Sequence, residues 1–369
     1  MDNGVSRQSR KGVLADLAFS FLRLGTMSIG GPAMHISLMR QEFVLRRGWL
    51  TEQEFLDRLG VTNLIPGPSS TEMAIHIGYQ RGGWAGLVLG GVCFLLPAVL
   101  ITGLIAALYV KMGNLPEADR ILATVKPVVI AIILKAVWGL SRTALKTPVL
   151  WAVAALATVL LATGVGPLAV LAVCGLASLC ATRLKQNLTL RTVDGLSLWT
   201  IFFTFAKIGS VIFGSGYVLV AFLQDDLVWK THWLTEKQLL DAVAVGQITP
   251  GPVFSTVTFI GYLLAGWQGA LAATAGVFLP AFVFVGLSGL VMDKLRKSAV
   301  VGQILDGVNV AAFVLIGFAG WILGRAAITG IYPAVVTVAS LILMTRFGVN
   351  TAWLVIGGIA MGLATSFIP

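Results

Sequence analysis

Two Pro-Gly-Pro sequences are the residues of this chain with the clearest capacity to bind an anion. Residues 65–71 read Ile-Pro-Gly-Pro-Ser-Ser-Thr, and residues 249–256 read Thr-Pro-Gly-Pro-Val-Phe-Ser-Thr. Proline ends a preceding helix and is tolerated in the first turn of the next one. Each sequence therefore predicts a helix start, where free N–H groups and the helix dipole attract anions; a kink used only for packing is the alternative. The candidate binding residues are Pro66, Gly67, Pro68, Ser69, Ser70, Thr71, Pro250, Gly251, Pro252 and Ser255.

Two glycine-rich breaks interrupt apolar stretches upstream of these sequences. Residues 28–32 read Ser-Ile-Gly-Gly-Pro, and residues 212–217 read Ile-Phe-Gly-Ser-Gly-Tyr. Such breaks let backbone approach a ligand closely, and non-helical backbone persists at membrane depth only where protein or a polar cavity satisfies it. Close helix packing by small residues is the alternative. The candidates at the breaks are Gly30, Gly31, Pro32, His35, Gly214, Ser215, Gly216 and Tyr217.

Each half of the chain also carries a basic residue deep within an apolar stretch, Arg23 and Lys207. Lys207 lies about 11 residues, or roughly 16 Å of helix, from the start of its stretch. A cation at such depth costs at least about 2.5–3.5 kcal/mol. An anionic substrate or an internal partner such as Glu42 or Asp226 would compensate the charge, and the sequence leaves both alternatives open.

Glu72 and His76 lie four residues apart and therefore share one helix face. They form either a hydrogen-bonded pair in a polar cavity or part of a proton-coupling step. No third ligand accompanies them and the His-Glu-x-x-His sequence is absent, so no metal site is predicted. The sequence also contains no nucleotide-binding P-loop and no nucleophile motif. We therefore expect a secondary transporter without a cofactor rather than an enzyme.

Composition places the chain in a membrane. Hydrophobic residues make up 57% of its 369 residues and charged residues 11%, with a mean hydropathy of +0.90. Soluble domains average roughly 45–50% hydrophobic residues and about 25% charged residues. Several apolar runs reach the approximately 20 residues that a bilayer-crossing helix needs, which predicts a polytopic α-helical membrane protein. The net charge of +10 is spread over short loops, as in cytoplasmic loops facing lipid, so the bilayer is the predicted partner and nucleic acid is not.

The chain consists of two copies of one unit. Trp-Leu-Thr at 49–51 recurs 184 residues later, at 233–235, and the Pro-Gly-Pro sequences follow the same shift from 66 to 250. After a one-residue deletion the shift is 183, from Gly78 to Gly261. Domains are predicted at residues 1–185 and 186–369, joined by a polar linker at 183–194. Duplicated units are typical of secondary transporters, which hold substrate near mid-membrane at the repeat interface.

Each half follows the same predicted order of elements. A glycine-broken apolar stretch is followed by a polar amphipathic segment (51–63 or 235–247) that is too charged to face lipid. A short helix then starts at Pro-Gly-Pro, and a long span interrupted by Pro97 or Pro280 leads to three further spans. The basic loops mildly favour parallel repeats over inverted ones.

Several sequences of this chain occur together in one known family. They are Gly30-Gly31-Pro32 with His35-Ile36, Trp49-Leu50-Thr51 with Glu54-Phe55, Pro66-Gly67-Pro68 before Gly78-Tyr79, Phe213-Gly214-Ser215-Gly216-Tyr217, and Pro250-Gly251-Pro252. With them the chain resembles the chromate ion transporter family, in its long, two-domain form. The resemblance covers nearly the whole chain, and it departs slightly at Ile29, where many members have phenylalanine.

The resemblance implies export of chromate across a bacterial inner membrane, conferring chromate resistance, with sulfate as a competing mimic. It also implies repeats of opposite orientation, which outweighs the charge count and gives the expected fold: an all-α, multi-pass protein of two inverted repeats with broken, re-entrant helices. A homodimer is a candidate assembly. The nearest rival function is import or exchange of sulfate or another oxyanion. An intramembrane enzyme acting on phosphates is a distant alternative.

Overall fold

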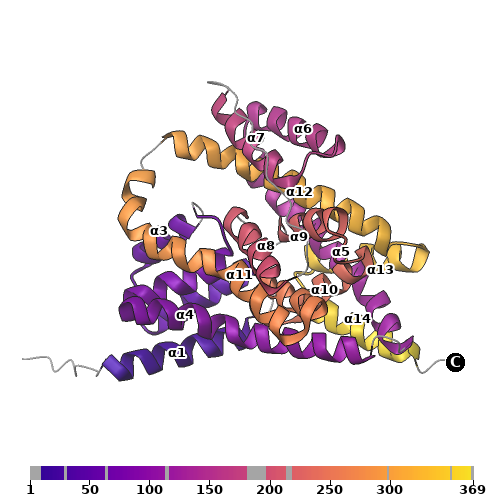
Figure 1. Ribbon diagram of the computed structural model, residues 1–369, viewed down its shortest axis with the longest axis horizontal. Coiled ribbons are helices and arrows are strands. Elements are labelled where there is room, and N and C mark those ends of the chain that lie inside the picture. The colour runs from indigo at the N-terminus through magenta and orange to yellow at the C-terminus, as the bar shows by residue number, and fades with distance from the viewer. Residues whose placement is uncertain are drawn as a thin grey trace, which may run out of the picture.

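The computed structural model describes residues 10–28, 31–62, 65–112, 116–180, 197–212, 218–296, 299–349 and 351–366, and these form helices in both halves of the chain (Figure 1). The first half contributes α1 (Arg10–Met27), α2 (Pro32–Arg40), η1 (Gln41–Arg46), α3 (Glu52–Thr62), α4 (Ser69–Met112), α5 (Pro116–Ala144), α6 (Pro148–Ala162) and α7 (Pro167–Cys180). The second half contributes α8 (Leu198–Val211), α9 (Val218–Leu223), η2 (Gln224–Lys230), α10 (Glu236–Ile248), η3 (Val253–Ser255), α11 (Thr256–Arg296), α12 (Ala299–Ala327), α13 (Ile331–Arg346) and α14 (Thr351–Ser366).

The two halves repeat one another element by element. Both contain a short helix that continues as a π-helical turn, α2 with η1 and α9 with η2, and both then form the predicted amphipathic helix, α3 or α10. The amphipathic helices begin with the same cap, because Thr51 and Thr235 each accept a hydrogen bond from the backbone three residues later. The predicted all-α architecture of two repeats is confirmed. The predicted linker at 183–194 lies outside the described residues.

Helices α4 and α11 are each a helical hairpin rather than one continuous rod. Gly83 has φ 59° and ψ −148°, and Gly266 has φ 57° and ψ −148°, which break the helical path. The two arms then pack together: a Cβ atom on Gly78 would lie 3.1 Å from the Cα atom of Gly90. Twelve residues of straight helix would separate these positions by about 18 Å, so the chain must reverse. A short helical arm followed by a longer one is found in both halves, but only the first half has its helix start directly at Pro-Gly-Pro, as predicted.

Within the part of the chain that the structure describes, four helical stretches are long and apolar enough to cross a membrane, namely 69–111, 123–141, 253–288 and 303–327. The first and third contain the hairpins. Their first arms, residues 69–82 and 256–265, cover 14 and 10 residues, or about 21 and 15 Å, which is short of the approximately 30 Å hydrocarbon core. These arms are therefore re-entrant in character. Along the second arm of α4, an exposed apolar stripe faces outward at helical spacing, as lipid contact requires; it comprises Leu96, Leu100, Leu104 and Leu108.

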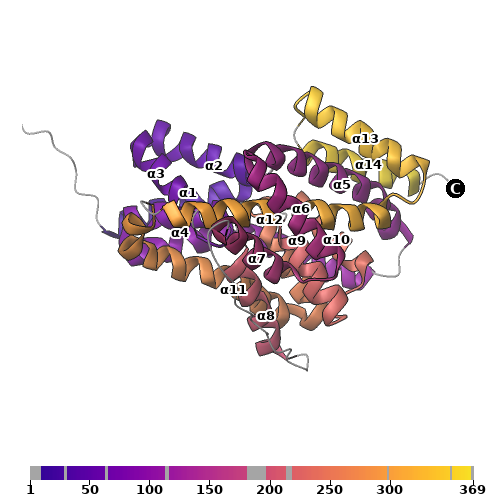
Figure 2. The same cartoon turned by 90° about the horizontal axis from the view of Figure 1, so that it is seen from above.

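The repeats interlock through reciprocal contacts. Helices α6 and α7 pack beside α12, and α13 and α14 pack beside α5 (Figure 2). The Trp84 ring lies 3.0 Å from the Cβ position of Gly286, and its repeat equivalent Trp267 lies 2.7 Å from that of Gly103. Exchanged contacts of this kind relate the halves by a two-fold pseudosymmetry. The inverted orientation of the repeats in the bilayer stays a prediction.

Candidate functional site

Each Pro-Gly-Pro loop is hydrogen-bonded to the broken segment of the other repeat. The backbone N–H of Gly67 donates to the carbonyl of Ile212 at 2.6 Å, and that of Gly251 donates to the carbonyl of Ser28 at 2.7 Å. Both the donors and the acceptors are repeat equivalents, 184 residues apart (67 to 251 and 28 to 212). The structure thus brings the predicted helix starts and helix breaks together in two crossed pairs.

The acceptors in these junctions are available because they lie where helices end. Helix α1 ends at Met27 and α8 at Val211, and the last carbonyls of a helix have no partner within it. Ile212 adopts an extended conformation with ψ 123°, which turns its carbonyl away from the helix. The glycine break in each repeat therefore supplies an acceptor that the Pro-Gly-Pro loop of the other repeat uses.

The glycines of both loops are required by backbone conformation and by space. Gly67 has φ +147° and Gly251 has φ +96°, in the range that side chains disfavour. A Cβ atom on Gly251 would lie 2.8 Å from the Cβ atom of Ala98, and one on Gly67 would lie 3.4 Å from that of Ala281. The residue after the proline inside each long helix, Pro97 in α4 or Pro280 in α11, thus packs on the loop glycine of the other repeat. Neither proline interrupts its helix, which corrects the prediction; the breaks lie at Gly83 and at Ala265–Gly266.

The first helix start buries several polar groups. Ser69, Ser70 and Thr71 form the buried first turn of α4, as predicted. Glu72 is fully buried and its carboxylate contacts Gly67 in the loop. Among the described residues, neither carboxylate oxygen of Glu72 has a hydrogen-bond partner, and the same is true of the Thr71 hydroxyl and of His76 Nε2. The predicted Glu72–His76 hydrogen bond is therefore wrong for this conformation.

The second helix start differs from the first. Only a 3-10 turn (η3) follows Pro252 directly, and α11 begins at Thr256, which corrects the prediction of a helix at that point. The Thr256 hydroxyl donates to the carbonyl of Val253 at 2.8 Å. Ser255 is buried and its Oγ accepts a hydrogen bond from Thr102 Oγ1 of α4 at 3.3 Å. Hydroxyl groups line this start, whereas the first start holds a carboxyl group.

His35 holds one of the junction carbonyls in place. Its side chain is fully buried, and its Nε2 lies 3.2 Å from the Ser28 carbonyl, the same oxygen that accepts from Gly251. Because a carbonyl can only accept, Nε2 carries the proton. The ring also meets Phe94 edge-on, with centroids 5.6 Å apart. His35 is therefore a positioning residue for the second Pro-Gly-Pro loop in this conformation.

The two predicted cations differ in their surroundings. The Lys207 ammonium lies 2.7 Å from Asp226 Oδ2, so one of the two predicted sources of compensation, an internal partner, is found. Arg23 is exposed on α1. Glu42, the internal partner considered for Arg23, instead accepts from Arg46 at 3.0 Å and from Arg47 at 2.5 Å.

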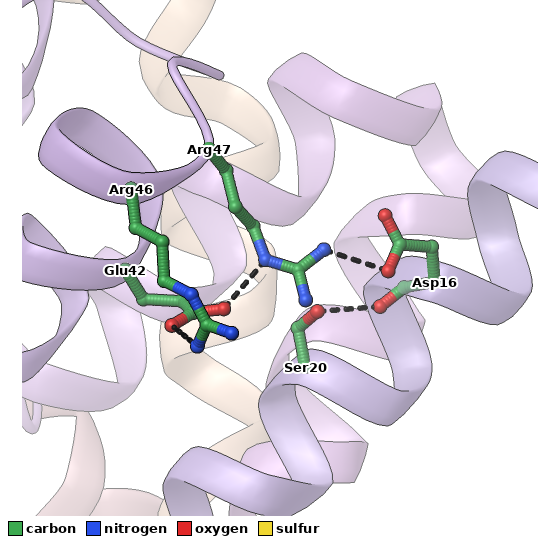
Figure 3. Close-up of polar contacts among 5 residues, drawn as sticks. All are labelled: Asp16, Ser20, Glu42, Arg46 and Arg47. Carbon is green, nitrogen blue, oxygen red and sulfur yellow. Dashed lines mark hydrogen bonds and ion pairs between the residues drawn. The ribbon is translucent and has the colours of Figure 1, made fainter.

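Figure 3 shows the Glu42 carboxylate with its two guanidinium partners, Arg46 and Arg47. Arg47 also reaches Asp16 on α1 at 2.7 Å, which ties η1 to the first helix. The Glu42–Arg46 pair recurs in the second repeat as Asp226–Lys230, at 3.4 Å. Lys230 also pairs with Asp225, so each cluster joins two carboxylates to two cations. In this conformation both clusters tie neighbouring segments together.

The remaining predicted binding residues lie in the loops and breaks themselves. Gly31 precedes α2 with φ +87°, and Pro32 is the first residue of that helix. Pro66 and Pro68 flank Gly67 in the first loop, and Pro250 and Pro252 flank Gly251 in the second. The remaining glycine-break candidates lie outside the described residues: Gly30, Gly214, Ser215, Gly216 and Tyr217.

Two polar features in contact with α4 were missed from the sequence. The first is Thr102, the partner of Ser255. The second is a buried ion pair in which the Lys126 ammonium lies 2.9 Å from Asp241 Oδ1, while Tyr109 donates to Oδ2 at 2.8 Å. The apolar run from Leu122 to Leu140 contains two lysines, Lys126 and Lys135, and charges within such a run were the available signal for this ion pair.

Comparison with known proteins gives consistent matches along the chain. The sequence model of the family described as chromate transporter matches residues 15–179 and again 199–363. A chromate transport protein of Cupriavidus metallidurans is 33% identical, covering 94% of this chain and 92% of its own length. A probable chromate transport protein of Synechococcus elongatus is 30% identical, covering 91% of each chain. A chromate transport protein of Pseudomonas aeruginosa is 31% identical, covering 80% of this chain and 78% of its own. No solved structure matches.

Proposed function

The chain belongs to the chromate transporter family, and on that premise we propose that it exports chromate across a bacterial inner membrane and confers chromate resistance. The relatives are named as transport proteins, which supports transport rather than enzymatic catalysis. The observation that carries the proposal is the crossed pair of junctions, Gly67 to Ile212 and Gly251 to Ser28. They hold two helix starts at the repeat interface, where secondary transporters bind their substrates.

The proposed substrate site lies at the two Pro-Gly-Pro helix starts together with the glycine breaks. N–H donors at a helix start suit an oxyanion, and the hydroxyl groups of Ser70, Thr71 and Ser255 are buried beside them. We assign the boundary between the two repeats to residues 185 and 186. Sulfate has the same tetrahedral shape and charge as chromate, and it is the proposed competitor.

Export requires no coupled ion on energetic grounds. Chromate is largely a dianion near neutral pH, and the negative interior of a cell drives anions outward. At about 2.3 kcal/mol per charge per 100 mV, two charges supply about 4.6 kcal/mol. This corresponds to roughly three decades of concentration ratio at about 1.4 kcal/mol per decade. Import of the same ion would have to overcome this energy.

The test is uptake of labelled chromate by energised everted vesicles, in which uptake corresponds to export from cells. We expect potential-dependent uptake that excess sulfate inhibits and that an ionophore collapsing the potential abolishes. Vesicles from cells without the protein are the control. Movement of sulfate or phosphate with no movement of chromate would overturn the substrate assignment. Uptake only in right-side-out vesicles would overturn the direction.

Glu72 is the proposed carrier of any coupled proton, because its carboxyl group is buried at the first helix start without a hydrogen-bond partner among the described residues. Glu72→Gln keeps the shape and removes the proton. We expect this variant to lose any response of chromate uptake to an imposed pH gradient while keeping at least about half of the potential-driven rate. The measurement is the initial rate of uptake at clamped potential, with and without the gradient.

Glu54→Gln is the matched control for this prediction. Glu54 accepts hydrogen bonds from the backbone N–H of Thr51 at 2.8 Å and from the Thr51 hydroxyl at 3.0 Å. These bonds hold the pKa of the Glu54 carboxyl below its usual value, so it stays ionised across the tested range. A Glu72→Gln variant that responds to the gradient as the wild type does would show that Glu72 carries no coupled proton.

A further inference from the structure

One buried face of α4 leads away from the second Pro-Gly-Pro loop. Ala98 packs on Gly251 and Thr102 donates to Ser255, and Tyr109 donates to Asp241. Positions 98, 102 and 109 are separated by four and seven residues, so they share one helix face. At 1.5 Å per residue, Tyr109 lies about 10 Å along the helix from Thr102. The polar groups on this face thus run from the loop toward the end of α4.

A buried ion pair lies at the end of this face. Asp241 on α10 is fully buried, and the Lys126 side chain on α5 is 14% exposed. The ammonium lies 2.9 Å from Asp241 Oδ1 but makes no aligned hydrogen bond to it, whereas Tyr109 donates to Oδ2 at 2.8 Å. The carboxylate is therefore anchored by the phenol, and the lysine is held mainly by charge.

The sequence does not repeat the residues of this ion pair in the other half of the chain. The repeat equivalents of Tyr109 and Lys126, at a shift of 183, are Met292 and Asn309. Asp57, the equivalent of Asp241, is partly exposed. The repeat fold therefore forms without this pair. A buried ion pair is often no more stabilising than apolar residues of similar volume, so stability alone gives little reason for it. Ionisable residues at membrane depth usually serve function.

Of Arg23, Lys207 and Lys126, Lys126 is the cation best placed to bind an anion. Lys207 is paired with Asp226 and 43% of its side chain is exposed, and Arg23 is exposed on α1. Lys126 is the more buried, and it lies at the end of the polar face that begins at Gly251. A doubly charged oxyanion would attract its ammonium more strongly than the single charge of Asp241 does.

We propose that Lys126 is an oxyanion-binding residue and that Asp241 is its counter-ion while no substrate is bound. This inference rests on the proposed function and extends its site. When the oxyanion arrives, the ammonium moves from Asp241 Oδ1 to a substrate oxygen, and Tyr109 keeps the carboxylate in place. The Thr102 and Ser255 hydroxyls continue the path toward Gly251. No covalent bond changes in this exchange.

The experiment compares Lys126→Met, Lys126→Arg, Asp241→Asn and the double variant Lys126→Met/Asp241→Asn in the vesicle assay at equal protein level. Lys126→Met is expected to lose at least about tenfold in uptake rate, and Lys126→Arg to retain more. Asp241→Asn frees the lysine, so the KM for chromate is expected to fall several-fold. The double variant is expected to match the wild type in thermal stability and remain as inactive as Lys126→Met.

The double variant separates binding from a structural role. If the pair only supports the fold, removing both charges restores transport as well as stability, and that result would overturn the proposal. An increase in KM for Asp241→Asn would also contradict it. The wild type is assayed with chromate and with sulfate. If it moves only sulfate, the chromate assignment fails while the same four variants, assayed with sulfate, still test Lys126. If it moves neither anion, both proposals are wrong.

Discussion

Replacing Gly251 by alanine is expected to lower chromate uptake by at least about tenfold at equal abundance in the membrane. Gly251 has φ +96°, a conformation that costs an alanine roughly 1–2 kcal/mol. Its new Cβ atom would lie 2.8 Å from the Cβ atom of Ala98, so one of the two backbones must shift. That shift would break the 2.7 Å hydrogen bond from Gly251 to Ser28 and move the second helix start.

Neighbouring packing leaves little room for such a shift. Ala98 is fully buried and follows Pro97, whose ring packs against Gly25 of α1. His35 holds the Ser28 carbonyl from the other side. The loop is therefore fixed by α1, α2 and α4 together, and the added methyl group displaces elements rather than one side chain.

Two further glycine variants serve as comparisons for the uptake rate of Gly251→Ala. Gly67→Ala meets the flexible Glu72 side chain, and its contact with Ala281 is ordinary at 3.4 Å, so a smaller loss is expected. Gly317→Ala on α12 meets no atom within 4 Å and should leave uptake unchanged. The measurement is the initial uptake rate in everted vesicles. Equal rates for Gly251→Ala and Gly317→Ala would mean that the junction does not control transport.

The sequence predicted the local elements of this fold because their causes are local. Proline and glycine set the start of α4, and hydropathy set the long spans, whereas the reversals at Gly83 and Gly266 were not predicted. Repetition at shifts of 184 and 183 residues then required the same elements twice. The Glu42–Arg46 pair could also have been predicted, since residues four apart on a helix attract one another when oppositely charged. Predicting this pair would have excluded Glu42 as the internal partner of Arg23.

The exchanged contacts could not be predicted in the same way. Nothing in the residues near Gly67 indicates that its N–H donates to Ile212, because the partner is set by how two whole repeats pack. Lys126 was missed for a different reason. Comparing the repeats draws attention to residues whose charge occurs twice, such as Arg23 and Lys207. Lys126 is not among them, because its equivalent in the second repeat is Asn309. A search based on symmetry cannot find a feature that breaks the symmetry.

Gly78→Ala is expected to cause the largest loss of stability, because the two arms of the α4 hairpin meet backbone to backbone. A Cβ atom on Gly78 would overlap the carbonyl oxygen of Gly86 and lie 3.1 Å from the Cα atom of Gly90. Neither neighbour has a side chain that could move aside. Overpacking in a core costs about 1–3 kcal/mol and occasionally more, and here the arms must separate. The repeat equivalent, Gly261, faces the same constraint from Gly269.

The measurement is the temperature at which the purified protein in detergent loses its monodisperse fraction. The unfolding temperature of domains of 150–250 residues falls by roughly 2–4 °C per kcal/mol of lost stability. We therefore expect Gly78→Ala to lower this temperature by about 5 °C or more. Gly139→Ala is the matched control, because Gly139 is exposed within α5 and a Cβ atom there would meet no atom within 4 Å. Alanine there gains about 0.5–1 kcal/mol in helix stability, which should leave the temperature unchanged or raise it. If the two variants melt alike, the arms of α4 are not in close contact and the chain does not reverse at Gly83.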